Sequence, residues 1–183
     1  MHRKLTQENI RFSIEEYLFE ISQIGSNLPD LRGIPLLQVL KRGETGIGPY
    51  KKVSLFEAAN RIMTDLVILR GVEWLLHSQQ FPFESYQVEY GNEDQYDHDI
   101  SASFEGQQLI GEAFNVARSF FQGKKAKMLK KMRDSETKEA TRLILANLDS
   151  VSDSYKPKLG PREAMLLVDV YGAASPKFWY ENR

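Results

Sequence analysis

The stretch HDISASFEGQQLIGEAFNV, residues 98–116, decides how the fold of this chain is interpreted. Polar and apolar residues alternate through DISASF, which is the period of a half-buried strand. The dipeptide EG predicts a two-residue turn, after which QQLIGEAFNV returns as a second strand. If Phe104 pairs with Gln107 across that turn, Asp99 lies directly opposite Glu112.

The opposed carboxylates of Asp99 and Glu112 need a physical reason, because like charges facing each other on a sheet lower stability. A divalent cation supplies one, since Mg²⁺ binds carboxylate oxygens. A bulge in either strand would shift the pairing by one residue and make the side chains diagonal neighbours or turn them apart. The hairpin therefore predicts a metal site, on the condition that the two-residue turn forms.

Length and composition predict one soluble domain over residues 1–183. Hydrophobic residues make up 42% of the chain, but none of their runs approaches the roughly 20 apolar residues of a membrane span, so no membrane partner is expected. The absence of cysteine excludes disulfides and thiolate metal sites. The first residues, MHRKLTQENIRF, lack the apolar segment of a signal peptide, and we expect a cytoplasmic protein.

Residues 1–50 predict an N-terminal helical extension. Apolar residues recur at helical spacing in TQENIRFSIEEYLFEISQI, and a short helix is expected at 35–41, before a loop rich in glycine. A longer helix begins at Ser54, which forms a capping box with Glu57. That helix should continue to about His77.

The remaining segments complete a core over residues 54–172. A strand is expected at 84–91, followed by the hairpin and by a helix over ARSFFQGKKAKMLKKMR. A further helix is predicted in SETKEATRLILANL, and the compact apolar run at 164–172 predicts a strand covered on both faces. The predicted order is helix, strand, strand, strand, helix, strand, which is an α/β (α+β) fold with a mixed sheet flanked by helices.

This order, together with the acidic pair, resembles the core of the PD-(D/E)xK nuclease superfamily, the restriction-endonuclease-like fold. In that family an acidic residue opens the second strand, and the third strand carries an acidic residue, one intervening residue and usually lysine. Asp99 and Glu112 match the two acidic positions. Phe114 stands where lysine is usual, and His98 stands where proline usually precedes the aspartate.

The resemblance implies a magnesium- or manganese-dependent endonuclease that hydrolyses phosphodiester bonds of DNA, and it also implies a homodimer. The metal ligands would be Asp99, Glu112 and the backbone carbonyl of Ala113. A metal ion in such a site stabilises charge on phosphoryl oxygens and makes bound water nucleophilic near neutral pH.

Two further residues are carried over from the resemblance, because some branches of the superfamily move catalytic groups to neighbouring elements. Lys124 is the first candidate for the missing lysine; Lys125 ranks lower because it shares a helix face with Met128 and Met132. Glu57 is expected as an additional acidic ligand, although a capping box alone also explains a glutamate there.

A dense run of lysines follows the hairpin. Between Arg118 and Arg133 there is no acidic residue, although the whole chain has a net charge of −1. Such segregation favours a polyanionic partner, and we predict phosphate contacts with nucleic acid, most simply DNA. The residues expected to make them are Lys124, Lys125, Lys127 and Lys131.

Two other classes of function remain open. Phe114 favours a catalytically inactive relative that serves as a nucleic-acid-binding or protein-interaction module. An unrelated α+β interaction protein, in which the hairpin is only structural, is the third hypothesis. Neither His77 nor His98 has a second histidine or a cysteine at zinc-ligand spacing, so a zinc site is not expected.

Overall fold

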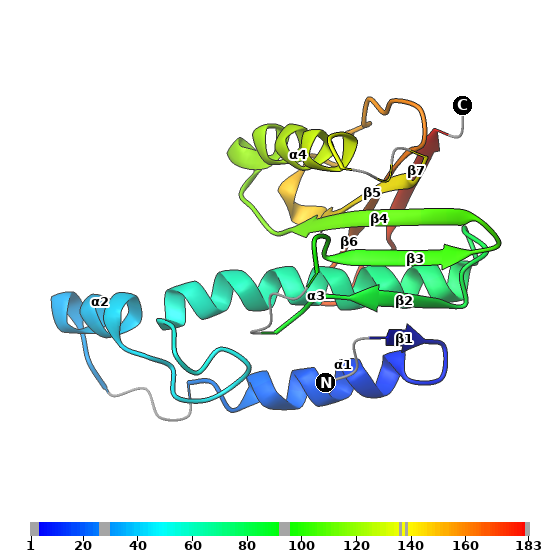
Figure 1. Ribbon diagram of the computed structural model, residues 1–183. Helices are drawn as coiled ribbons and strands as arrows, with labels where there is room; N and C mark the ends of the chain where they lie inside the picture. The colour runs from blue at the N-terminus through cyan, green and yellow to red at the C-terminus, as the bar shows by residue number, and fades with distance from the viewer. Residues whose placement is uncertain (1–3, 26–29, 92–95, 136, 138, 182–183) are drawn as a thin grey trace.

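The computed structural model describes residues 4–25, 30–91, 96–135, 137 and 139–181. Within those residues, four α-helices pack on an open, mixed sheet of seven strands, which follow one another across the sheet in chain order (Figure 1). The elements are β1 (Lys4–Thr6), α1 (Ile10–Ser22), α2 (Gly33–Arg42), α3 (Leu55–Ser78), β2 (Ser85–Val88), β3 (Ile100–Phe104), β4 (Gln107–Phe114), α4 (Arg118–Arg133), β5 (Thr141–Asn147), the 3₁₀ turn η1 (Leu148–Ser150), β6 (Glu163–Val168) and β7 (Lys177–Glu181).

The sheet contains both antiparallel and parallel pairs of strands. Strands β1 to β4 are antiparallel to their neighbours, β4, β5 and β6 run parallel, and β7 returns antiparallel to β6. Helix α4 makes the crossover that parallel pairing of β4 and β5 requires. Figure 1 shows α4 on one side of the sheet and α3, with α1 beyond it, on the other.

The three parallel strands, β4, β5 and β6, are largely buried on both faces, because helices cover both sides of the sheet. In β4, Leu109 and Ala113 belong to the core under α3, whereas Ile110 and Phe114 belong to the core under α4. Strands β5 and β6 repeat this division, and five of the seven residues of β5 and all six of β6 are buried. Their sequences are therefore continuous apolar runs.

This two-sided burial corrects one prediction from the sequence. The segment SETKEATRLILANL was expected to form a helix, but its second half is strand β5. Leu143 and Leu145 face the α3 core, while Ile144 faces the α4 core. A short run that is apolar on every side does not distinguish a buried strand from a buried helix by periodicity. Strands β1 and β7, at the edges of the sheet, were not predicted either.

Helix α3 lies close to the sheet at Gly71. A Cβ atom at this position would overlap Cδ2 of Leu145, which is fully buried in β5. We predict that Gly71→Ala lowers the free energy of unfolding by a net amount of about 1 to 2 kcal/mol, because overpacking outweighs the gain in helix propensity. Urea unfolding measures the change. Gly123→Ala on α4, where a Cβ meets no atom within 4 Å, is the matched control and should stabilise the chain.

Among the described residues, no helix combines the length and the apolar character that crossing a membrane requires.

Candidate functional site

The hairpin forms with the predicted register. Phe104 pairs with Gln107, and the two turn residues between them have positive φ angles of 47° at Glu105 and 79° at Gly106, as a tight two-residue hairpin turn requires. The ladder continues to Ile100 opposite Gly111, and the next position on each strand is occupied by Asp99 and Glu112. The predicted two-residue turn is confirmed.

Asp99 is held at the start of β3 by two backbone contacts. Its carbonyl accepts a hydrogen bond from Glu89 N at 2.8 Å, and its carboxylate Oδ2 accepts one from Ala113 N at 2.7 Å. Burial raises the pKa of the Asp99 carboxyl to about 6; the Ala113 hydrogen bond opposes this, and the negative charge of Glu112 adds to it. The positive charges of Lys131 and Lys124 act in the opposite direction.

Glu112 is buried on the side of the sheet that α4 covers, with 3% of its surface exposed. Its Oε1 lies 2.8 Å from Lys131 Nζ and 2.7 Å from His98 Nδ1, which donates when that nitrogen carries the proton. Lys131 was predicted as a contact to nucleic acid. In the structure it forms an ion pair with Glu112, a candidate metal ligand, while its side chain stays 47% exposed, and its contact with nucleic acid stays a prediction.

An open cleft of about 490 Å³ lies beside Asp99. Its walls come from the first half of α3, the loop before α3, residues 89–91, the end of β4 and the first half of α4. The polar and charged residues that line it are Tyr50, Asn60, Arg61, Thr64, Asp65, Glu89, Tyr90, Asp99, Asn115 and Lys124. The structure thus brings Asp99, Ala113 and Lys124, three of the predicted residues, to one cleft.

Asp65 is a residue of the cleft that sequence reasoning missed. It is 4% exposed, and its Oδ2 accepts hydrogen bonds from the hydroxyls of Tyr17 and Tyr50, at 2.5 and 2.7 Å, and from Gly91 N at 2.9 Å. Burial raises the pKa of the Asp65 carboxyl to about 6, against these hydrogen bonds, and the charge of Asp99 adds to the rise. The only signal in the sequence was a lone carboxylate inside the apolar run MTDLVIL.

Glu57 is not brought to this cleft. Its Oε1 lies 2.6 Å from Arg61 on the exposed surface of α3, and its backbone N–H donates to Ser54 Oγ at 3.2 Å. The predicted capping role of Ser54 is confirmed. Asp65, two helical turns further along α3, is the carboxylate that lines the cleft. Glu57 is not among the residues that line the cleft, and its role as an acidic ligand stays a prediction.

The remaining predicted lysines differ in exposure. Lys125 is buried and its Nζ donates to the hydroxyl of Tyr155 at 3.3 Å. This placement does not favour a phosphate contact, which stays a prediction. Its side chain lies on the same buried face of α4 as Met128 and Met132. Lys127 is exposed, and contact between it and nucleic acid stays a prediction.

The residues present fit only a water-rich metal site. Among the described residues, no group of three or more histidine, aspartate or glutamate side chains is placed to hold a metal ion. Asp99 and Glu112 offer two carboxylates, and each already has one oxygen in a hydrogen bond or ion pair. Mg²⁺ suits such a site, because it binds through one or two carboxylates and keeps several of its waters.

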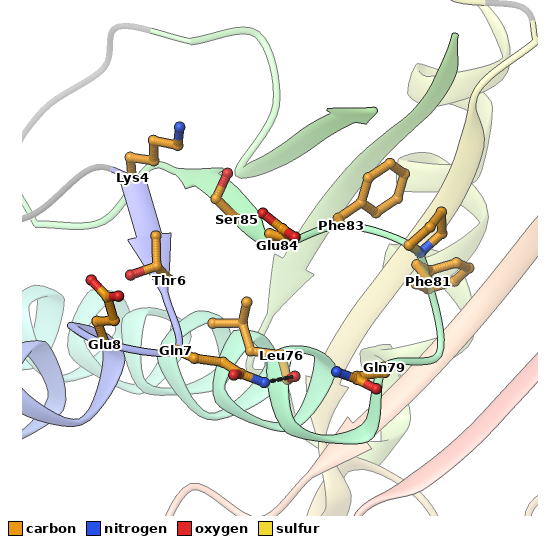
Figure 2. Close-up of a pocket in the computed structure, with 11 residues that line it drawn as sticks. Lys4, Thr6, Gln7, Glu8, Leu76, Gln79, Phe81, Phe83, Glu84 and Ser85 are labelled. Carbon is orange, nitrogen blue, oxygen red and sulfur yellow. Dashed lines mark hydrogen bonds between the residues drawn. The ribbon is translucent and has the colours of Figure 1, made fainter. Parts of the chain in front are cut away.

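A larger cavity lies elsewhere, at the end of α3 and beside β1 and β2, and has a volume of about 710 Å³ (Figure 2). Gln7 Nε2 donates to the Leu76 carbonyl there, at 2.8 Å. The two acidic side chains in its walls, Glu8 and Glu84, are both exposed. Since the buried Asp65 and the partly buried Asp99 both line the smaller cleft, that cleft is the candidate site.

Comparisons of the chain with protein-family models, with curated proteins and with solved structures find no match.

Proposed function

We propose that this chain is a metal-dependent nuclease of the PD-(D/E)xK type that hydrolyses phosphodiester bonds of DNA. The observation that carries the proposal is that Asp99 and Glu112 stand one position beyond the last pair of the ladder, Ile100 with Gly111, and that Asp99 and Lys124 line one cleft, which Glu112 does not line. The order α3, β2, β3, β4, α4 supports a restriction-endonuclease-like core, since it repeats the expected helix, strand, strand, strand, helix. The expected last strand, at 164–172, corresponds to β6, and β5 precedes it where a helix was expected.

The contacts of each residue support a separate role for it in the proposed reaction. Mg²⁺ or Mn²⁺ would be held by Asp99, Glu112 and the carbonyl of Ala113, and it would supply charge stabilisation to the phosphate and lower the pKa of a bound water. Ala113 N fixes the orientation of the Asp99 carboxylate at 2.7 Å. His98 and Lys131 fix Glu112 in the same way, from the other side.

Lys124 is the group we assign to the phosphate. It lines the cleft together with Asp99, and its positive charge acts on the Asp99 carboxyl. An ammonium in that position neutralises charge that develops on a phosphoryl oxygen, which is the role of the lysine that Phe114 replaces. Arg61, on the opposite wall, is a second cation within the same cleft.

A second candidate function is a nucleic-acid-binding or protein-interaction module without catalysis. Phe114 favours it, because its side chain is 2% exposed and packs on Phe121 with ring centroids 5.7 Å apart. The side chain at the usual lysine position therefore packs in the core under α4, although residue 114 also borders the cleft. The two candidates differ in whether metal leads to cleavage.

The test is cleavage of supercoiled plasmid DNA with Mg²⁺ or Mn²⁺, compared with a chelator. We expect nicking by the wild-type chain only with metal, and loss of about 100-fold or more in Lys124→Ala, because removing one group that stabilises charge in the transition state typically costs about 10²- to 10³-fold. Lys130→Ala is the matched control, since Lys130 is exposed on the same helix and pairs with Asp134. An intact plasmid together with salt-sensitive DNA binding would favour the module.

A further inference from the structure

Four side chains form a stripe along one face of α4. Phe120, Lys124, Lys127 and Lys131 follow one another at separations of four, three and four residues, which places them above one another on a helix. The stripe is about 16 Å long, since an α-helix rises about 1.5 Å for each residue. It is distinct from the buried face of the helix, which packs in the core under α4. We call these four residues the α4 stripe.

Two contacts show which way the α4 stripe faces. Helix α4 packs against β4, the strand that carries Glu112 (Figure 1). Lys131 Nζ lies 2.8 Å from the carboxylate of Glu112, and Lys124 lines the cleft beside Asp99. The stripe therefore runs along the side of α4 that is turned toward the two candidate metal ligands. A chain of phosphates that follows the stripe passes the candidate site.

The charge of the α4 stripe is positive along its whole length. Helix α4 contains no acidic residue, and among the described residues neither Lys124 nor Lys127 forms an ion pair. Lys130, which lies outside the stripe, is paired with Asp134. Two unpaired ammonium groups beside the cleft suit consecutive phosphates of one strand, and binding through them should weaken as the salt concentration rises.

Phe120 places an aromatic ring at the end of this row of cations. It is 69% exposed and one turn before Lys124, whereas its neighbour Phe121 is 1% exposed in the core. Exposed apolar side chains that stand alone are common, but Phe120 stands in line with three lysines. Proteins hold single-stranded nucleic acid by combining a basic track for the backbone with aromatic rings on which bases stack. In a duplex the bases already stack on one another, so a ring on a helix surface needs an unpaired base.

We propose that the α4 stripe binds single-stranded DNA, with Phe120 stacked on an unpaired base and Lys124 and Lys127 bound to the phosphates that follow it. The substrate of the proposed nuclease, on which this assignment rests, is then a strand with unpaired nucleotides rather than an intact duplex. The cleft beside Asp99 has a volume of about 490 Å³, the size of a pocket for one small organic molecule, which suits a single nucleotide better than a base pair.

Fluorescence anisotropy on the full chain tests the assignment, with a labelled single strand and the matching duplex, in a chelator so that cleavage does not interfere. We expect the wild-type chain to bind the single strand more tightly. Phe120→Ala should raise the dissociation constant for the single strand by about 5- to 100-fold, because stacking on one base is lost, and should leave that for the duplex nearly unchanged. Phe19→Ala, which removes a ring of the same 69% exposure from α1, is the matched control and should change neither.

Two further variants separate stacking from charge. Phe120→Trp should keep the affinity for the single strand, because an indole ring also stacks on a base. Lys127→Ala should weaken binding and lower the salt dependence by about one phosphate contact, whereas Lys130→Ala should alter it less, since Lys130 is already paired. Circular dichroism verifies that each variant is folded.

The assignment is overturned if the wild-type chain binds neither nucleic acid, or binds single strand and duplex equally, or if Phe120→Ala binds the single strand as the wild type does. A chain that nicks plasmid DNA and gives one of these results would keep the nuclease function and lose the stripe. A chain that binds single strands through Phe120 and cleaves no DNA would keep the stripe and lose the nuclease function.

Discussion

Asp99→Asn is expected to abolish metal-dependent cleavage while leaving the hairpin intact. The side-chain oxygen of asparagine can still accept the hydrogen bond from Ala113 N, which spans 2.7 Å in the wild-type chain. What the variant loses is the negative charge on a direct metal ligand. Removing a residue that only hydrogen-bonds to a metal ligand typically lowers metal affinity or activity 10- to 100-fold. Asp99→Asn changes the proposed ligand itself, so we expect it to lower the cleavage rate by more than about 100-fold.

Two measurements on the same samples separate the effect on metal from an effect on folding. In the wild-type chain, Mg²⁺ or Mn²⁺ should raise the melting temperature, because an ion that binds only the native state stabilises it. In Asp99→Asn that rise should disappear together with plasmid nicking. Asp134→Asn, which removes an exposed carboxylate paired with Lys130, is the control and should keep both. Cleavage by Asp99→Asn at the wild-type rate would remove Asp99 from the site.

The positive charge of Lys131 balances the negative charge of the buried Glu112 carboxylate. Glu112 is 3% exposed, and an uncompensated carboxylate at that depth would be strongly unfavourable. Lys131 Nζ, at 2.8 Å from Oε1, supplies the positive charge that a divalent cation would otherwise supply. The metal binding proposed at Asp99 and Glu112 would therefore compete with an internal ion pair. Because Lys131 is half exposed, the ion pair can open without unfolding α4.

The hairpin could be predicted from sequence because its signals are local. Strict alternation of polar and apolar residues, together with Glu105 and Gly106 at the turn, specifies both strands and their register within 98–116. The start of α3 was predictable for the same reason, since Ser54 caps its own helix. In both cases the deciding contacts join residues that are near each other in the chain.

The features that escaped prediction depend on contacts between distant segments. Strand β5 is recognisable only once α3 and α4 are known to cover both faces of the sheet. Asp65 is recognisable only once Tyr17, 48 residues earlier in the chain, is known to donate to it. The pairing of Lys131 with Glu112 depends on how α4 lies across β4, which no spacing in the sequence reveals.

Asp65→Asn should change how stability depends on pH. Burial raises the pKa of the Asp65 carboxyl from its usual value near 4 to about 6 in the folded chain. The folded state therefore holds this proton more tightly than the unfolded state does. The stability that results is fully present below about pH 4 and is lost as the pH rises through about 6. A shift of this size corresponds to about 2 to 3 kcal/mol above that range.

Asp65 accepts three hydrogen bonds, and the asparagine of the variant must accept the same three. Tyr17 and Tyr50 stay neutral because burial, with the nearby Asp65 charge, raises the pKa of both phenols, and Gly91 N is the third donor. The side-chain oxygen of asparagine can accept from all three, as Oδ2 does now. Asp99 is the remaining charge that acts on the site, and it repels the Asp65 carboxylate.

Asparagine does not titrate. The variant therefore does not lose free energy of unfolding as the pH rises to neutral, whereas the wild-type chain does. Between pH 4 and pH 7, the unfolding free energy of Asp65→Asn should rise relative to that of the wild-type chain by about 2 to 3 kcal/mol. Urea unfolding at the two pH values measures the difference, with Asp134→Asn as an exposed carboxylate for comparison. A difference that stays constant with pH would show that Asp65 titrates as an ordinary aspartate. A metal-induced rise in melting temperature that survives in Asp65→Asn would separate its structural role in the cleft from that of Asp99.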